Sequence, residues 1–395
     1  MGHSMASDAY SVQSVYLDYN ATTPMRPAAL KATYEALTAV GNASSIHHPG
    51  RDAATRVDKA RRRVADLLNC SPGELIFTSG ATEANNLALQ AAYTQSGWII
   101  TSAVEHPAVL ETARALTKDA PGRLAILAVD SEGQIDLNAF RSALEQGGVA
   151  LVSIMLANNE TGVITDLVPM IEAAHSVGAL VHTDATQYVG RLPLDLGDLD
   201  VDLLSLSAHK FGGPQGVGAL FIRRSTPLTQ RPLVFGGGHE RGWRAGTLNV
   251  PGIAGMGAAA EAVHRQLDDE APRITKLRDL LEDELLAQLP GSHVNGAAVP
   301  RLPGVTSISF PGIPADALLA AMPDVAASDG SACSAGAPSP SHVLVAMGLS
   351  RDDADSTIRF SLGYATTEQE IRRAVEGTVR AVTSVHAAMY PTDNP

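Results

Sequence analysis

Cysteine is scarce in this sequence. Its 395 residues include two cysteines, Cys70 and Cys333, and their wide separation predicts neither a disulfide framework nor a pair of thiolates at metal-ligand spacing. Basic residues are also outnumbered. The chain has 29 lysines and arginines against 42 acidic residues, and its formal charge of −13 disfavours nucleic acid or an anionic membrane as a direct partner. We therefore expect a metal-free protein of a reducing, cytoplasmic compartment.

Long apolar runs are missing as well. The longest, GVALVSIMLA at 148–157, reaches only about half the length of a membrane-spanning helix. Residues 1–20 contain neither a basic start nor an apolar stretch of signal-peptide length. We expect no secretion and no membrane association.

Short apolar runs alternate with longer helical stretches such as 49–69 and 166–177. Hydrophobic residues make up 45% of the chain and charged residues 18%, which is enough to build a large core. The runs are continuous rather than alternating, so we expect strands buried on both faces of a mostly parallel sheet in an α/β fold. The runs are LIFTSG at 75–80, WIITSAVEH at 98–106, LAILAVD at 124–130, VALVSIMLAN at 149–158, ALVHTDA at 179–185, VDLLSLSAHK at 201–210 and GALFIRR at 218–224.

The alternation of short apolar runs with helical stretches ends at a long helical stretch that follows GTLNVPG and contains Pro272. The length favours two domains, and we take this stretch as the passage between them. We expect a large domain over 21–265 and a smaller α+β domain formed by 6–20 with 266–395. The loop of small residues and prolines at 328–342, SDGSACSAGAPSPSH, would lie on the smaller domain.

Lys210 is one of only five lysines and follows an apolar strand directly before the glycine-rich turn FGGPQG. That position is at the carboxyl end of a strand, where open α/β sheets bind ligands. Asp184 ends another apolar run, and a lysine amine with such a carboxylate is what pyridoxal phosphate requires of a protein. The alternatives are a lysine reaching out to solvent and an aspartate that caps a helix.

Three further segments carry candidate chemistry. SGATEANN at 79–86 runs from a strand into a helix, so its amides and the Thr82 hydroxyl could bind an anion or simply form a capped turn. Cys333 lies in the small-residue loop and could be an accessible nucleophile or a tolerated thiol, and Asp329 nearby would oppose thiolate formation. Arg359 could grip a carboxylate or form a surface salt bridge.

The remaining polar residues support plainer interpretations. Cys70 follows ADLLN, and we expect it to pack at a helix end. The run Arg61, Arg62 and Arg63 predicts a solvated helix face. His47 and His48 are expected to lie in a loop.

Taken together, nine segments resemble the cysteine desulfurase family from about Tyr16 to about Ile371, with nearly constant spacing. The resemblance implies a fold-type I pyridoxal-phosphate enzyme of the class V aminotransferase group, a seven-stranded sheet in the large domain, and a homodimer. The long loop resembles the branch of the family whose thiol travels to its partners. The segments are LDYNATTP, GNASSIHHPGR, SGATEANN, EHPAVLE, ANNETGVI, HTDATQ, SLSAHKFGGPQGVGAL, GGGHERGWRAGTLN and GSACS.

The resemblance implies a set of contacts to pyridoxal phosphate. Lys210 would form the Schiff base, Asp184 would pair with the pyridine nitrogen and Gln187 would contact the phenolic oxygen. His106 would stack on the ring. The other implied cofactor contacts are Ala81, Thr82, Asn159, Ser207 and His209, with Thr247 reaching in from the second subunit.

The resemblance also implies the reaction. Asn159 and Arg359 would hold the carboxylate of L-cysteine while the Lys210 amine acts as base at Cα. Cys333 would attack the substrate sulfur and become a persulfide, leaving L-alanine. His106 is a candidate proton shuttle, although stacking without proton chemistry is equally compatible with the sequence.

Other functions stay open at this point. The persulfide could serve iron–sulfur assembly, tRNA or DNA thio-modification or another thiolation, through an acceptor protein that the sequence does not identify. A selenocysteine lyase, another pyridoxal-phosphate β-lyase or an aminotransferase would share most of the motifs. A non-catalytic scaffold with this fold would have little need of Lys210.

Overall fold

The computed structural model describes residues 14–94, 97–329 and 340–390. Its centre is a seven-stranded sheet with the order β2-β8-β7-β6-β5-β3-β4. β8 is antiparallel to both of its neighbours, and the other pairings are parallel. The strands are β2 (Leu75–Thr78), β3 (Trp98–Ser102), β4 (Leu124–Leu127), β5 (Val149–Ser153), β6 (Leu180–Asp184), β7 (Leu203–Ser207) and β8 (Gly218–Ile222). The predicted mostly parallel sheet is confirmed, and each of the seven apolar runs forms one of its strands.

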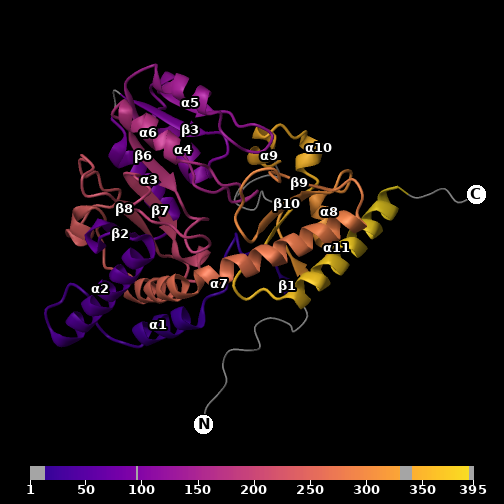
Figure 1. The fold of residues 1–395 in the computed structure, drawn as a ribbon. Coiled ribbons are helices and arrows are strands. Elements are labelled where there is room, and N and C mark those ends of the chain that lie inside the picture. Colours follow the sequence, from indigo (N-terminus) through magenta and orange to yellow (C-terminus); the bar gives the residue numbers. More distant parts are fainter. Residues whose placement is uncertain (1–13, 95–96, 330–339, 391–395) are drawn as a thin grey trace, which may run out of the picture.

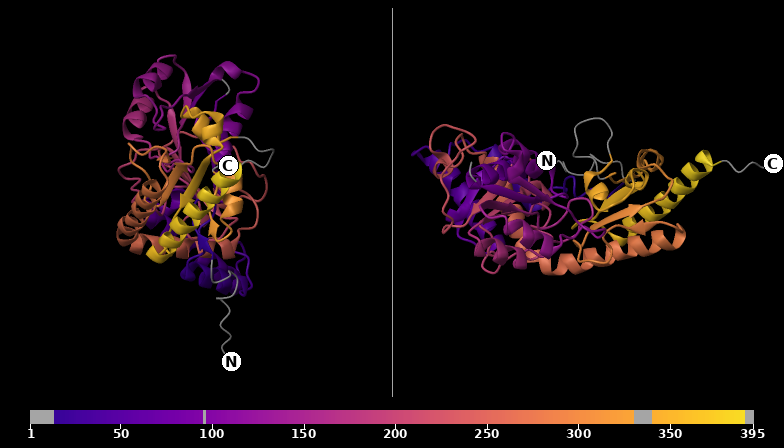
Figure 2. Two further views of the ribbon diagram at one scale, coloured as in Figure 1. Left: turned by 90° about the vertical axis from the view of Figure 1, so that its right-hand side faces the viewer. Right: turned by 90° about the horizontal axis from the view of Figure 1, so that it is seen from above.

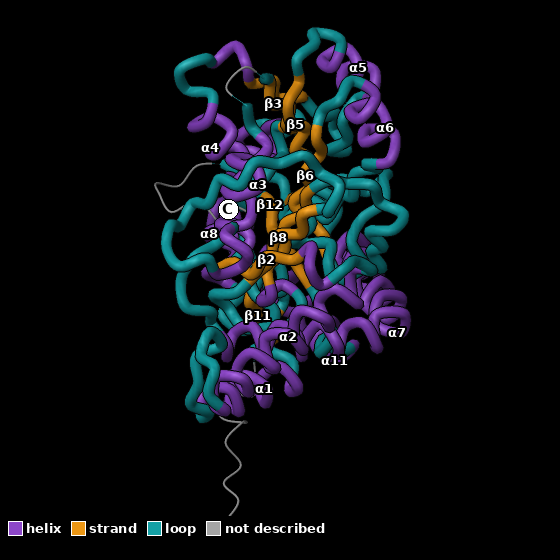
Figure 3. The backbone as a smooth tube through the Cα atoms, turned by 90° about the vertical axis from the view of Figure 1, so that its left-hand side faces the viewer, coloured by secondary structure: helices purple, strands orange, loops and turns teal. Residues whose placement is uncertain are grey.

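Helices cover both faces of this sheet (Figure 3). Neighbouring residues of one strand belong to different apolar clusters: Ile99 packs with residues of α3 and α4, and Ile100 packs with residues of α2, α5, α6 and α7. This arrangement explains the continuous apolar runs, because a strand covered on both faces favours apolar side chains at successive positions. The helices are α1 (Pro27–Leu37), α2 (His48–Leu68), α3 (Ala81–Ala92), α4 (Pro107–Leu116), α5 (Leu137–Leu144), α6 (Val168–Ser176) and α7 (Val250–Gln288).

A second, smaller sheet lies in the C-terminal part, with the antiparallel order β12-β10-β9. Near the other end of the chain, β1 (Val15–Tyr16) pairs in parallel with β11 (Val325–Ala326), and its residues join the apolar cluster of this part. The remaining elements are β9 (His293–Val294), β10 (Val305–Ser309), β12 (Thr357–Ser361), α8 (Ala315–Ala321), α9 (His342–Ala346), α10 (Arg351–Ala354) and α11 (Glu368–Met389). The division into a large domain over 21–265 and a smaller domain formed by 6–20 with 266–395 stays a prediction.

α7 joins the two parts of the molecule (Figure 1). It is 39 residues long, runs through Pro272 without interruption, and is capped by Asn249, whose side chain accepts a hydrogen bond from the Gly252 amide. Its first half packs under the large sheet and its second half under the small one. Figure 2 shows α7 extending along one side of the molecule to meet α11.

Two predictions for polar residues at α2 hold only in part: that Arg61, Arg62 and Arg63 form a solvated face, and that His47 and His48 lie in a loop. Arg61 is not solvated, because its guanidinium pairs with Glu240 at 2.5 Å and donates to the Leu75 carbonyl. Arg63 forms an ion pair with Glu261. Only Arg62 is exposed. His47 is the N-cap of α2, where its side chain accepts from the Gly50 amide, and His48 is the first residue of the helix. Three consecutive helical residues point about 100° apart, so they cannot share one environment.

No helix in the described ranges has the length and apolar character that crossing a bilayer requires. Among the same residues, no group of three or more histidine, cysteine, aspartate and glutamate side chains is arranged to hold a metal ion.

Candidate active site

A pocket of about 370 Å³ opens at the carboxyl ends of the parallel strands. β6 ends at Asp184, β7 ends at Ser207, and the chain leaving β3 leads to His106. Because parallel strands end at one edge of a sheet, these residues converge there. The pocket is lined by ten predicted site residues, namely Ala81, Thr82, His106, Asn159, Asp184, Gln187, Ser207, His209, Lys210 and Arg359.

Lys210 ends a single 3₁₀ turn, Ala208–Lys210, directly after β7. Its Nζ amine donates to the Ala21 carbonyl at 2.9 Å and to the Asn20 carbonyl. The side chain is partly buried and lines the pocket, so it does not reach out to solvent. The amine is therefore directed to the interior by carbonyl groups of the N-terminal segment.

Asp184 is buried at the end of β6, and both of its carboxylate oxygens accept hydrogen bonds. One accepts from the Asn85 side chain at 2.7 Å, and the other accepts from the Thr186 amide at 3.0 Å within a tight turn. Asp184 caps no helix, since a turn follows the strand. Donation from Asn85 on α3 fixes the carboxylate toward the pocket.

The turn before α3 provides hydrogen-bond donors for an anion. Gly80, with φ +155° and ψ −179°, adopts a backbone conformation that side chains disfavour, and α3 begins at the next residue, leaving its first amides unpaired within the helix. β8 packs closely on this turn, because a Cβ on Gly218 would lie 2.7 Å from the Gly80 Cα. Glu83 on the same turn pairs with Arg244 at 2.9 Å, which offsets its negative charge.

Two histidines of the pocket are neutral at physiological pH. His106 is the N-cap of α4, and its Nδ1 accepts from the Ala108 amide at 3.0 Å, so the neutral ring carries its proton on Nε2. Burial lowers the pKa of His106, while the nearby Asp184 opposes this shift. Burial and the neighbouring Lys210 lower the pKa of His209 to about 4.

Arg359 lies on β12 and enters the pocket from the C-terminal part. Its side chain is only 3% exposed, so the predicted surface salt bridge is wrong, and its ion pair with Asp18 at 2.7 Å is largely buried. It also donates to the Asn159 carbonyl at 3.1 Å. The Arg359 Nε atom is buried with no partner among the described residues.

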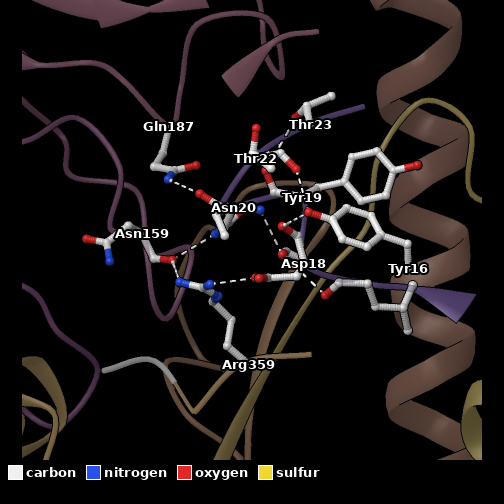
Figure 4. Close-up of polar contacts among 12 residues, drawn as sticks. Tyr16, Asp18, Tyr19, Asn20, Thr22, Thr23, Asn159, Gln187 and Arg359 are labelled. Atoms are coloured by element: carbon white, nitrogen blue, oxygen red, sulfur yellow. Dashed lines mark hydrogen bonds and ion pairs between the residues drawn. The ribbon is translucent and has the colours of Figure 1, made fainter. Parts of the chain in front are cut away.

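Asn20 was not predicted as a site residue, yet it lies at the centre of this network (Figure 4). Its side chain donates to the Asn159 carbonyl at 2.8 Å and accepts from Arg191. Its own carbonyl accepts from Gln187 at 3.1 Å and from Lys210. The motif LDYNATTP was the only sequence signal for it, because its partners are far away along the chain.

Several polar atoms at the pocket are buried without a partner within the described ranges. They belong to side chains that line it: the Gln187 Oε1, the Asn85 Oδ1 and the Thr186 Oγ1 atoms. Unpaired buried polar atoms are costly, so their concentration here indicates a polar ligand.

Thr247 is exposed and does not line the pocket. Cys333 lies outside the described residues, so its role and the predicted effect of Asp329 on it stay predictions. Cys70 is partly buried, and burial raises its pKa to about 12, which makes it a poor nucleophile.

Comparisons with known proteins agree with this architecture. The family model described as aminotransferase class-V matches residues 15–374. The cysteine desulfurase IscS of Proteus mirabilis is 44% identical over 370 residues, which cover 92% of this chain and 91% of that protein. A solved NifS-like protein aligns with a TM-score of 0.86 and 36% identity over 94% of this chain and all of that chain (100%). The structure of SspA in complex with cysteine aligns with a TM-score of 0.77 and 31% identity, covering 89% of this chain and 99% of that chain.

The chain therefore belongs to the aminotransferase class-V family, and within it to the cysteine desulfurases. This result confirms the predicted family, the fold-type I architecture and the reaction class.

Proposed function

We propose that this chain uses pyridoxal phosphate, bound at the carboxyl edge of the seven-stranded sheet, to transfer the sulfur of L-cysteine to Cys333. The main support is the convergence of the Lys210 amine and the Asp184 carboxylate in one pocket, where several other buried polar atoms lack partners among the described residues. A lysine amine, a buried carboxylate and a set of anion-binding amides are the groups that this cofactor requires.

The residues present fit the cofactor. Lys210 would bind its aldehyde carbon, and Asp184 would hold a proton on the ring nitrogen. The first amides of α3, with Thr82, Ser207 and His209, would bind its phosphate. The Gln187 side chain, whose Oε1 atom has no partner among the described residues, would contact the phenolic oxygen. When bound, pyridoxal phosphate supplies an electron-withdrawing ring that stabilises the charge left after the substrate Cα loses a proton.

Arg359 and Asn159 would orient the substrate. A guanidinium group binds a carboxylate through parallel hydrogen bonds, and the unpartnered Arg359 Nε atom is free to donate one of them. Asn159 lines the same pocket, and its side chain points away from Arg359 (Figure 4). With the carboxylate fixed there, the Lys210 amine takes the proton from the substrate Cα.

Cys333 then attacks the sulfur of the substrate. A new S–S bond forms and the S–Cβ bond of the substrate breaks, with the electron pair left on the substrate carbon. That carbon is protonated and becomes the methyl group of alanine. The sulfur atoms are oxidised as the carbon is reduced, so one enzyme thiol and one cysteine give one persulfide and one alanine without another reagent.

His106 lies beside this chemistry as a neutral ring with its proton on Nε2. We assign it to stacking on the cofactor and to proton transfer from Nε2 toward the substrate. Thr247 completes the phosphate site of a second subunit in a homodimer. The persulfide passes to the thiol of an acceptor protein in the cytoplasm.

The test is to measure alanine and sulfide made from L-cysteine by the purified wild type, Lys210→Ala and Cys333→Ala, with and without dithiothreitol. We expect both variants to lose activity, and Cys70→Ala to keep it as the matched cysteine control. Full sulfur release by Cys333→Ala would contradict the role of that thiol and indicate direct lyase chemistry. Activity retained by Lys210→Ala would contradict the role of the cofactor.

A further inference from the structure

The chain on both sides of residues 330–339 is attached to the wall of the active site. Before them, Ser328 forms two backbone hydrogen bonds with Arg359, at 3.1 Å and 2.6 Å. After them, the Ser341 hydroxyl donates to a carboxyl oxygen of Glu160, and His342 Nε2 donates to the Glu105 carbonyl at 2.9 Å. Each of these partners is a pocket residue or the chain neighbour of one.

Of these attachments, the bond between Ser341 and Glu160 is the one made between two side chains. Both residues are buried, with exposed fractions of 4% and 5%. Ser341 is also the N-cap of α9, since its oxygen accepts from the Leu344 amide at 3.1 Å. One hydroxyl therefore fixes the start of α9 to the strand-end segment that carries Asn159.

A carboxyl group in this place is costly for stability. Burial raises the pKa of Glu160 to about 7; the Ser341 hydroxyl and the charge of Arg359 oppose the shift, and Asp329 adds to it. An apolar side chain of similar size would avoid this penalty. The geometry gives this carboxyl group a role apart from stability. Through its bond to Ser341, it connects the pocket wall that carries Asn159 to the chain that leads to Cys333.

We propose that Glu160 is a positioning residue, whose bond to Ser341 holds the attachment point of the Cys333 segment at the distance that sulfur transfer requires. This inference rests on the proposed role of Cys333. Glu160 touches neither substrate nor cofactor, so it acts on the transfer of sulfur to the thiol and leaves substrate binding unchanged.

The test is a single-turnover experiment on the cofactor-loaded enzyme with L-cysteine, quenched with iodoacetamide and analysed by mass spectrometry for persulfide on Cys333. Substrate binding is followed separately through the absorbance change of the cofactor. We expect Ser341→Ala to slow persulfide formation by about tenfold or more with unchanged cysteine binding, because small displacements of a reacting group have effects of this size. Ser341→Thr and Glu160→Gln keep the hydrogen bond and should stay within about threefold of the wild type.

Ser350→Ala is the matched control. Ser350 caps α10 as Ser341 caps α9, accepting from the Asp353 amide at 3.1 Å, but its side chain bonds to the half-buried Asp353 instead of Glu160. We expect this variant to behave as the wild type. Wild-type rates of persulfide formation in both Ser341→Ala and Glu160→Ala would overturn the proposal. A wild type that binds cysteine but forms no persulfide on Cys333 would overturn the proposed function itself, and this inference with it.

Discussion

The two walls of the pocket are held in place in different ways. On the wall formed by the large sheet, Asp184 and Ser207 are the last residues of buried strands, and Lys210 follows one turn later, so backbone hydrogen bonds of the sheet position them. On the wall formed by the C-terminal part, side-chain bonds add to the backbone pairing of β12, such as Arg359 with Asp18 and Ser341 with Glu160. We infer that the sheet wall holds the proposed cofactor-binding residues, such as Lys210 and Asp184, and that the C-terminal wall positions the groups that would meet them, such as Arg359.

The largest effect is expected on the sheet wall, from Asp184→Asn. An amide still accepts a hydrogen bond from the Thr186 amide, but it has no charge to hold a proton on the cofactor ring. We expect kcat to fall by about 10²–10³, the size typical of losing one preorganised electrostatic contact. Steady-state assays with the cofactor-saturated variant check this, and a kcat above a third of the wild-type value would refute the assigned role.

The second prediction concerns Glu105, which connects the two walls. Its carboxyl oxygen accepts from the Ser102 hydroxyl and the Met155 amide, both at 2.8 Å, and its carbonyl accepts from His342. Burial raises the pKa of Glu105 to about 8. Since the folded pKa lies above the unfolded one, the contribution of Glu105 to the free energy of unfolding is fully present below about pH 4.5 and is lost as the pH rises to about 8.

Glu105→Gln should remove that pH dependence. Between pH 5 and pH 8 we expect the wild type to lose on the order of 2 kcal/mol more stability than the variant. Denaturant unfolding at a series of pH values measures this difference, and Glu145→Gln, at an exposed position, is a suitable control. Parallel pH profiles for Glu105→Gln and the wild type would show that Glu105 does not titrate in this range.

The smallest effect is expected on the C-terminal wall, from Arg359→Lys. Lysine keeps the charge and loses the planar pair of donors, so the substrate carboxylate should bind about tenfold more weakly. We expect KM to rise by about tenfold, and kcat to fall by less than it falls in Asp184→Asn. Asp18→Asn, which keeps the guanidinium and removes its ion pair, serves for comparison. An unchanged KM in Arg359→Lys would contradict the proposed binding of the substrate carboxylate by Arg359, and with it the difference between the two walls.

The sequence predicts the sheet wall better than the C-terminal wall, for a physical reason. Strands buried on both faces leave continuous apolar runs, and a polar residue at the end of such a run indicates the edge where ligands bind, which is how Lys210 and Asp184 were found. Asn20 and Glu160 act through contacts with residues far away along the chain, Asn20 with Lys210 among others and Glu160 with Ser341. No local pattern records such pairs. Asn85 was missed because its partner, Asp184, lies on another element.

The 39-residue helix α7 also determines how this protein should unfold. At 1.5 Å per residue it is about 58 Å long. Ile253 and Val263 pack in the core of the large sheet, and Leu281 and Leu285 pack in the core of the C-terminal part. Neither core can open without exposing apolar residues of a helix on which the other depends. The chain should therefore melt as one cooperative unit, so that a destabilised variant loses both walls of the pocket together.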